Sequence, residues 1–142
     1  MAKVKIALPE KFLFSTELTV RIGDVNYSGH LGNDSVLSLV HEARVRFFKT
    51  LGFTEADAGG PGIIMSDATV AYRSESFQGD RLNVQVGIGE ADHYRFELIY
   101  LFTNKETGKE VARVCTGIVF FDYDKRKICK MPDAFAKKTG LS

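Results

Sequence analysis

The residues best suited to chemistry lie in one short segment, at positions 23–34. It reads Gly-Asp-Val-Asn-Tyr-Ser-Gly-His-Leu-Gly-Asn-Asp, so it contains two carboxylates, two amides and a histidine. A carboxylate or an imidazole can act as a general base or as a nucleophile. Glycines let the backbone approach a ligand closely, because they have no Cβ. The segment therefore predicts either a reaction centre or a polar loop that satisfies only its own backbone.

The element that follows this segment determines what the segment faces. Its apolar residues are Val36, Val40, Ala43, Phe47 and Leu51, at spacings of four, three, four and four. This periodicity predicts a largely buried helix over 33–51. The first N–H groups of a helix have no acceptor within it and can stabilise an anion or a developing oxyanion. The alternative is a capping loop, since Asn33, Asp34 and Ser35 are all good N-cap residues, and composition alone favours it.

The rest of the chain has the pattern of strands. Residues 82–88 alternate between apolar and polar or glycine, which is typical of a half-buried strand. Apolar runs predict further strands over 12–22, 63–72, 94–102 and 110–121, and residues 132–138 predict a short final helix. The polar run 104–108 indicates a hairpin. Short turns between the last strands require antiparallel pairing, because parallel strands need long crossovers.

Length and composition exclude several classes of protein. The chain has 142 residues, 44% apolar and 26% charged, which is typical of one ordered domain over residues 1–142. The net charge of +1 provides no general attraction to nucleic acid or to an anionic membrane. The sequence contains no apolar stretch near the ~20 residues that span a bilayer, and Pro9, Glu10 and Lys11 interrupt the pattern of a secretion signal. We therefore expect a soluble, cytoplasmic protein.

Three smaller features have structural interpretations. The basic run Lys125-Arg126-Lys127 is interpreted as a solvated turn. Cys115 and Cys129 fit no zinc spacing, and Cys115, within an apolar run, is interpreted as a core residue. No cofactor and no metal site are expected.

The order of elements predicts the architecture. One strand, one buried helix and four antiparallel strands are best accommodated as an α+β fold, in which a sheet of about five strands wraps around one long central helix. One face of this sheet and its edge strands stay uncovered. Exposed edges favour self-association, so we expect a homodimer or a homotetramer.

The ordered residues of the polar segment and its helix resemble those of a known family. The pattern Asp24-x-Asn26-x-x-Gly29-His30-Leu31-x-Asn33, followed by His41-Glu42-Ala43-Arg44-Val45-Arg46-Phe47-Phe48 and Leu51-Gly52-Phe53, resembles the 4-hydroxybenzoyl-CoA thioesterase family of hot-dog proteins. The turn Phe77-Gln78-Gly79-Asp80-Arg81-Leu82 also resembles this family. The resemblance implies a hot-dog fold and hydrolysis of an acyl-CoA or acyl-carrier-protein thioester in a cleft between subunits. It also implies an oxyanion site at the helix N-terminus, with the N–H near Asn33 as the donor.

One position departs from the family pattern. The family's usual catalytic acid is the second aspartate of the loop, which here is Asn26, and an amide cannot act as a carboxylate base. We expect Asp24 to take this role, with Asn26 and His30 orienting substrate or water. Asp34 and Asp67 are the alternative carboxylates, although Asp67 within an apolar strand is better explained as paired or edge-exposed.

The remaining predicted roles are binding and structural. Gly29, Asn33 and Asp34 are predicted to contact the substrate. On the helix, Glu42 is expected to pair with Arg46, four residues later.

Two other functions remain open at this stage. The Asp24-x-Asn26 pair with His30 is also similar to the motif of MaoC-like enoyl-CoA hydratases. However, the histidine comes one residue later than that motif requires, and Tyr27 replaces its usual proline. The third possibility is a protein that binds acyl-CoA or an acyl carrier without catalysis, because Asn26 would fit a lost activity.

Overall fold

The computed structural model describes residues 4–141. Its elements in chain order are strand β1 (Phe14–Thr19), the 3₁₀ turn η1 (Ile22–Asp24), helix α1 (Asn33–Thr50), strands β2 (Gly62–Tyr72), β3 (Arg81–Ala91), β4 (Arg95–Asn104), β5 (Glu110–Asp122) and β6 (Lys127–Cys129), and helix α2 (Asp133–Thr139). The predicted order of strand, long helix, four strands and short helix is confirmed.

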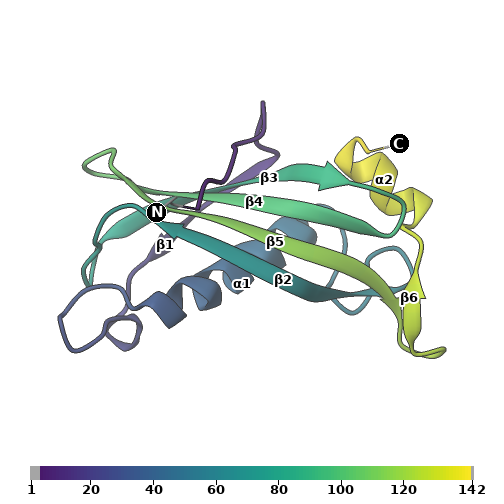
Figure 1. Ribbon diagram of the computed structural model, residues 1–142, viewed down its shortest axis with the longest axis horizontal. Helices are drawn as coiled ribbons and strands as arrows, with labels where there is room; N and C mark the ends of the chain where they lie inside the picture. The colour runs from purple at the N-terminus through teal and green to yellow at the C-terminus, as the bar shows by residue number, and fades with distance from the viewer. Residues whose placement is uncertain (1–3, 142) are drawn as a thin grey trace.

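The strands form one antiparallel sheet in the order β1-β3-β4-β5-β2, and α1 lies along one face of it (Figure 1). The predicted α+β arrangement of a sheet around one long helix is therefore confirmed. The sheet has a sixth strand, β6, which pairs with the end of β5 and was not predicted. Lys127 begins this strand, so the basic run is only partly the turn that was expected. A strand of three residues, such as β6, is too short for an alternation of apolar and polar residues to be recognised in the sequence.

The main core lies between α1 and the inner face of the sheet. Leu98, Tyr100 and Phe102 of β4 point inward and are fully buried, and they pack in one cluster with Phe47 and Phe48 of α1. Burying each large apolar side chain contributes about 1.5–3 kcal/mol, so this cluster fixes how α1 lies on the sheet. It thereby fixes the position of the N-terminus of α1.

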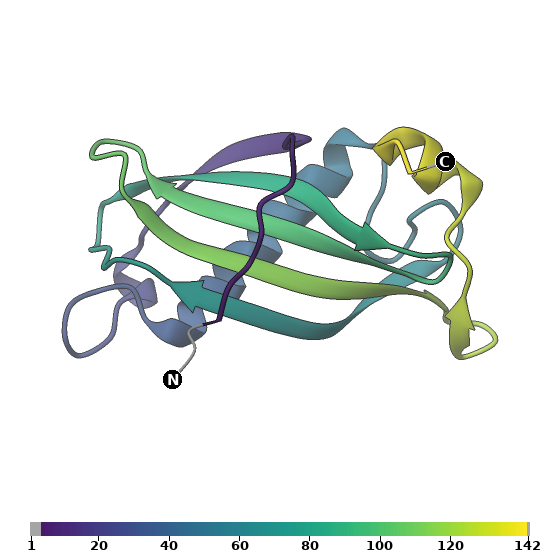
Figure 2. The same cartoon turned by 45° about the horizontal axis from the view of Figure 1, so that its top comes forward.

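The outer face of the sheet is crossed by the N-terminal segment (Figure 2). Ile6 of this segment packs with Ala71 and Ile99, and Arg113 Nη1 donates a hydrogen bond of 3.0 Å to the Ile6 carbonyl oxygen. Cys115 is half-buried against this small outer cluster, so the prediction that it belongs to the core holds only for this cluster. A cavity of about 530 Å³ lies between the segment and the strands, on the side of the sheet opposite α1.

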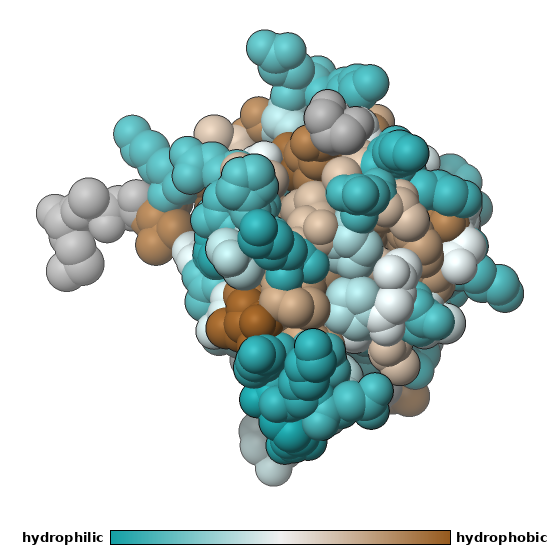
Figure 3. Space-filling model, turned by 90° about the vertical axis from the view of Figure 1, so that its right-hand side faces the viewer, coloured by the Kyte–Doolittle hydropathy of each residue, from teal (hydrophilic) through white to brown (hydrophobic). Residues whose placement is uncertain are grey.

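Helix α2 closes one end of the molecule. Phe135 is fully buried and its ring lies 5.0 Å from those of Phe96 and Phe120, measured between centroids. The surface at this end is a mixture of hydrophilic and hydrophobic residues (Figure 3). Within residues 4–141, no helix combines the length and the apolar character needed to cross a membrane.

Candidate functional site

Helix α1 begins at Asn33, within the polar segment 23–34 that was identified in the sequence. Gly32 is the N-cap residue, with an extended backbone (φ −72°, ψ 150°) and no side chain to cap the helix. The prediction that Asn33, Asp34 or Ser35 is the N-cap is therefore wrong, because these residues already form the first turn. Among the described residues, the structure records no acceptor for the backbone N–H groups of Asn33 and Asp34. A helix start without a side-chain cap leaves its donors available to a ligand.

The side chain of Asp34 folds back over this helix start. A Cβ atom placed on Gly32 would lie 2.8 Å from Asp34 Oδ1, so a larger residue at the N-cap would displace the carboxylate. Asp34 and Asn33 are both exposed. Their predicted contacts with substrate stay predictions, as does that of Gly29.

Asp24, the second residue of the segment, is buried and is bound to Arg21. Its Oδ2 accepts hydrogen bonds from the Arg21 backbone N–H (2.8 Å) and from Nε (3.2 Å), and its Oδ1 accepts one from Nη2 (3.0 Å). Its side chain is only 4% exposed, whereas that of Arg21 is 73% exposed. The guanidinium of Arg21 lowers the pKa of Asp24 below its ordinary value, because it stabilises the charged form.

This geometry favours a positioning role for Asp24. Its backbone carbonyl oxygen also accepts a hydrogen bond from the N–H of Gly32 (2.9 Å), which ties it to the N-cap. The catalytic role predicted for Asp24 stays a prediction, and it requires a side chain that is only 4% exposed to reach the substrate.

Asn26 shapes the turn in front of the helix. Its side-chain Oδ1 accepts a hydrogen bond from the N–H of Ser28 (3.0 Å), and its carbonyl oxygen accepts one from the N–H of Gly29 (2.9 Å). Gly29 adopts φ +85°, which disfavours any residue with a side chain. Asn26 is exposed, so its amide nitrogen is free to orient a ligand or a water molecule, although not to accept a proton.

His30 lies two residues before the N-cap and faces the loop between β2 and β3. Its ring is perpendicular to that of Phe77, with centroids 6.4 Å apart, and its Nε2 lies 3.8 Å from Glu75 Oε1. The His30 side chain is 30% exposed, so the imidazole reaches solvent. Among the residues predicted to be catalytic, His30 combines a solvent-accessible position with a side chain that can accept a proton.

The end of β2 and the loop between β2 and β3 supply neighbours that were not identified from the sequence. Tyr72 Oη donates a hydrogen bond of 3.0 Å to the carbonyl oxygen of Asn33, and the Ser76 carbonyl oxygen accepts one of 2.7 Å from the N–H of Leu31. Ser76 Oγ is buried and has no partner within residues 4–141. Tyr72 and Asn33 are 39 positions apart in the sequence, and the isolated bridge between His30 and Phe77 brings the two regions together.

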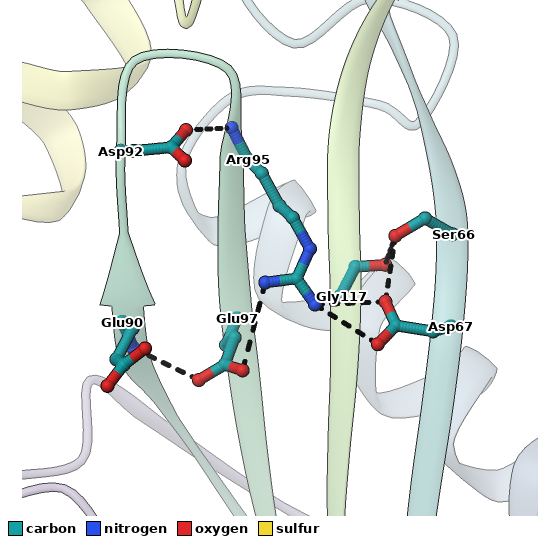
Figure 4. Close-up of polar contacts among 7 residues, drawn as sticks. All are labelled: Ser66, Asp67, Glu90, Asp92, Arg95, Glu97 and Gly117. Carbon is teal, nitrogen blue, oxygen red and sulfur yellow. Dashed lines mark hydrogen bonds and ion pairs between the residues drawn. The ribbon is translucent and has the colours of Figure 1, made fainter.

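Asp67 lies on the outer face of the sheet, away from the start of α1 (Figure 4). Both its carboxylate oxygens accept hydrogen bonds from Arg95 Nη2, at 3.0 and 3.1 Å, and Oδ1 accepts one from Ser66 Oγ at 2.8 Å. This pair crosses β5 at Gly117, where an added Cβ would clash with Asp67 Oδ1 and with the Arg95 guanidinium. The prediction that Asp67 is paired and exposed is confirmed.

The polar residues of α1 have structural partners. Arg46 Nε donates to Glu42 Oε2 at 2.7 Å, as predicted. Arg44 is buried and pairs with Glu55, whose other oxygen lies 2.8 Å from His41 Nε2. Burial raises the pKa of Glu55, but the charge and hydrogen bonds of Arg44 and His41 outweigh it and the net shift is downward. Within the described range there is no cluster of His, Cys, Asp and Glu side chains arranged to hold a metal ion.

Comparisons with known proteins agree with this architecture. Residues 20–139 match the family model of the thioesterase-like superfamily. A 1,4-dihydroxy-2-naphthoyl-CoA thioesterase from Synechocystis is 22% identical, with a TM-score of 0.81 over 89% of this chain and 95% of its own. A hypothetical protein from Staphylococcus aureus in complex with CoA is 18% identical, with a TM-score of 0.82 over 96% of this chain and 86% of its own.

A third similar structure is that of a 4-hydroxybenzoyl-CoA thioesterase mutant complexed with 4-hydroxybenzoyl-CoA. It is 16% identical, with a TM-score of 0.80 over 89% of this chain and 97% of its own. No curated protein matches the chain. These likenesses confirm the hot-dog fold that the sequence predicted.

Proposed function

Because the chain belongs to the thioesterase-like superfamily, we propose that it hydrolyses the thioester bond of an acyl-CoA or an acyl-carrier-protein substrate. The observation that carries this proposal is the pair of free N–H groups at Asn33 and Asp34, at the start of an 18-residue helix. A thioester carbonyl placed there would have its developing negative charge stabilised by two donors and by the helix dipole. Removing one such donor typically costs about 10²–10³ in rate.

The other residues of the polar segment prepare this site. Asp24 fixes the N-cap through Gly32, and Asn26 shapes the turn that leads to it. His30 has a partly exposed side chain, and an imidazole can act as a general base. We assign it the role of general base, which activates water for attack on the thioester carbonyl.

The competing assignment gives this role to Asp24, and a matched pair of variants separates the two. Asp24→Asn removes the carboxylate, whereas Arg21→Gln keeps it and removes the guanidinium that occupies it. If Asp24 holds the loop, both variants lower kcat, because both disrupt the hydrogen bonds between the guanidinium and the carboxylate. If Arg21→Gln keeps full turnover while Asp24→Asn abolishes it, Asp24 is the base and our assignment is wrong.

Self-association is part of the proposal. Strand β2 lies at an edge of the sheet, and residues 64–69 are exposed, including the apolar side chains of Ile64 and Met65. An uncovered edge of this kind favours pairing with another chain. We therefore propose a homodimer or homotetramer that acts in the cytoplasm, and gel filtration showing only monomer at micromolar concentration would contradict it.

The experiment that tests the activity is a panel of acyl-CoA substrates monitored with a thiol reagent. Release of CoA thiol that is linear in enzyme concentration is the expected result. Loss of enoyl absorbance without thiol release would instead indicate a hydratase. Binding of acyl-CoA with neither signal would identify a non-catalytic binding protein, in agreement with Asn26 at the usual position of the acid.

A further inference from the structure

We propose that Glu75 is a positioning residue for His30, and that the two side chains form a histidine–carboxylate pair that serves the reaction at the N-terminus of α1. This inference rests on the proposed thioester hydrolysis and extends it to a residue outside the polar segment. Glu75 belongs to the loop between β2 and β3, and its Oε1 lies 3.8 Å from His30 Nε2. No other carboxylate within residues 4–141 lies within 4.0 Å of a ring nitrogen of His30.

The backbone holds the two residues opposite each other. An isolated antiparallel bridge joins His30 to Phe77, and the N–H of Leu31 donates a hydrogen bond of 2.7 Å to the carbonyl oxygen of Ser76. The carbonyl oxygen of His30 accepts a hydrogen bond of 3.0 Å from the N–H of Asn26. The chain on both sides of the pair is therefore fixed, although Glu75 itself is 66% exposed.

The ring of Phe77 limits how the imidazole can turn. The two rings lie at 85°, so the edge of one faces the plane of the other, an arrangement that aromatic pairs prefer. With Nε2 directed at Glu75, the carboxylate favours the tautomer that carries its proton on Nε2. Nδ1 then keeps its lone pair and can accept a proton.

The separation of 3.8 Å is an ion-pair distance and is longer than a hydrogen bond. Catalytic hydrogen bonds are often long in the free enzyme and shorten when substrate is bound. The exposed side chain of Glu75 has the freedom to close this gap. The pair thus supplies the proton transfer that Asn26 cannot supply.

The step balances with water as its one co-reactant. His30 Nδ1 takes a proton from water as the water oxygen bonds to the thioester carbonyl carbon, whose oxygen becomes negative next to the N–H groups of Asn33 and Asp34. The C–S bond then breaks, and the leaving thiolate takes the proton back from His30. Glu75 stabilises the imidazolium between these two events, because it carries the opposite charge. The products are a carboxylic acid and a thiol.

Kinetics of four variants test the pair in the full-length protein. His30→Ala is expected to lower kcat about 10²–10⁴-fold. Glu75→Gln is expected to lower kcat about tenfold with little change in KM, since it removes only part of the contribution of general-base catalysis, and Glu75→Asp restores part of the loss. The double variant His30→Ala/Glu75→Gln is expected to be no slower than His30→Ala alone, because Glu75 acts only through His30.

Two controls separate positioning from a structural effect. Glu90→Gln changes another exposed glutamate, on β3, which forms no ion pair within the described residues, and should leave kcat unchanged. Added imidazole should raise the turnover of His30→Ala but not that of Glu75→Gln. Neither result depends on the stability of the loop.

The outcomes distinguish this inference from the proposed function. If the wild type hydrolyses acyl-CoA but Glu75→Gln is as fast, or if the losses in the double variant multiply, Glu75 is not a positioning residue. If the wild type releases no thiol from any acyl-CoA or acyl-carrier-protein substrate, the proposed hydrolysis and this inference are both wrong.

Discussion

The free N–H group of Asn33 can be removed without removing the helix, and this provides a direct test of the oxyanion site. Asn33 is the first residue of α1, directly after the N-cap. Proline is favoured at this position because the N–H has no partner within the helix and the fixed φ suits a helix start. The residue before a proline must be extended, and Gly32 already is, with φ −72° and ψ 150°. Asn33→Pro therefore deletes one donor while the fold is retained.

The expected magnitudes for stability and activity are very different. The free energy of unfolding should change by less than about 1 kcal/mol, because no helical hydrogen bond is lost and the unfolded chain becomes stiffer. The hydrogen bond from Tyr72 Oη uses the carbonyl oxygen of Asn33, which proline keeps. Turnover should fall about 10²–10³-fold, equivalent to about 2.7–4 kcal/mol of transition-state stabilisation. The variant should thus lose turnover while its free energy of unfolding stays nearly unchanged.

The assay compares Asn33→Pro with Asn33→Ala. Alanine removes the same side chain and keeps the N–H, so any loss common to both variants belongs to the side chain. Thiol release gives kcat and KM, and thermal unfolding shows whether α1 is intact. If Asn33→Pro is as active as Asn33→Ala, the Asn33 N–H contributes nothing to stabilising the transition state, and the proposed oxyanion site is wrong.

Four further outcomes follow from named contacts. Asp24→Asn should lower the free energy of unfolding by about 1–2 kcal/mol at neutral pH. Because the pKa of Asp24 is lowered in the folded state, this contribution to stability is lost as the pH falls below about 4. The unfolding curves of the variant and the wild type should therefore converge in acid. Gly117→Ala should displace the ion pair of Asp67 on the outer face and change stability by no more than about 1 kcal/mol, with unchanged kcat; a large loss of kcat would return Asp67 to the reaction centre. Phe135→Ala should lower the free energy of unfolding by about 3–5 kcal/mol in denaturant titrations, because it leaves a cavity among buried aromatic rings. Burial raises the pKa of Cys115 to about 11, so the folded protein should alkylate slowly there at pH 8 by mass spectrometry, and rapid labelling would contradict this burial.

Much of the fold was predictable because its signals are local. The helix over 33–51 shows a 3.6-residue period, and the strand over 82–88 shows a period of two. Both elements appear within three residues of the expected ends. By contrast, β6 has three residues, and its pairing with β5 depends on a turn rather than on a pattern.

The helix start shows where local signals fail. Asn33, Asp34 and Ser35 have the composition of N-cap residues, yet Gly32 takes that position. The N–H of Gly32 is bound to the Asp24 carbonyl oxygen, and that of Leu31 to the Ser76 carbonyl oxygen. These two bonds fix the path of the chain before the helix. The choice of N-cap is therefore made by the surrounding structure rather than by side-chain preference.

The sequence by itself determined which residue types are available for chemistry. It located them in one segment before a buried helix, and it showed that Asn26 cannot be the base. Only the tertiary structure decided how they are used. It tied Asp24 to Arg21, left the N–H groups of Asn33 and Asp34 free, and brought Glu75 to His30. The physical reason is that composition is local, whereas the availability of a donor or a carboxylate depends on neighbours that sheet pairing brings from far along the chain.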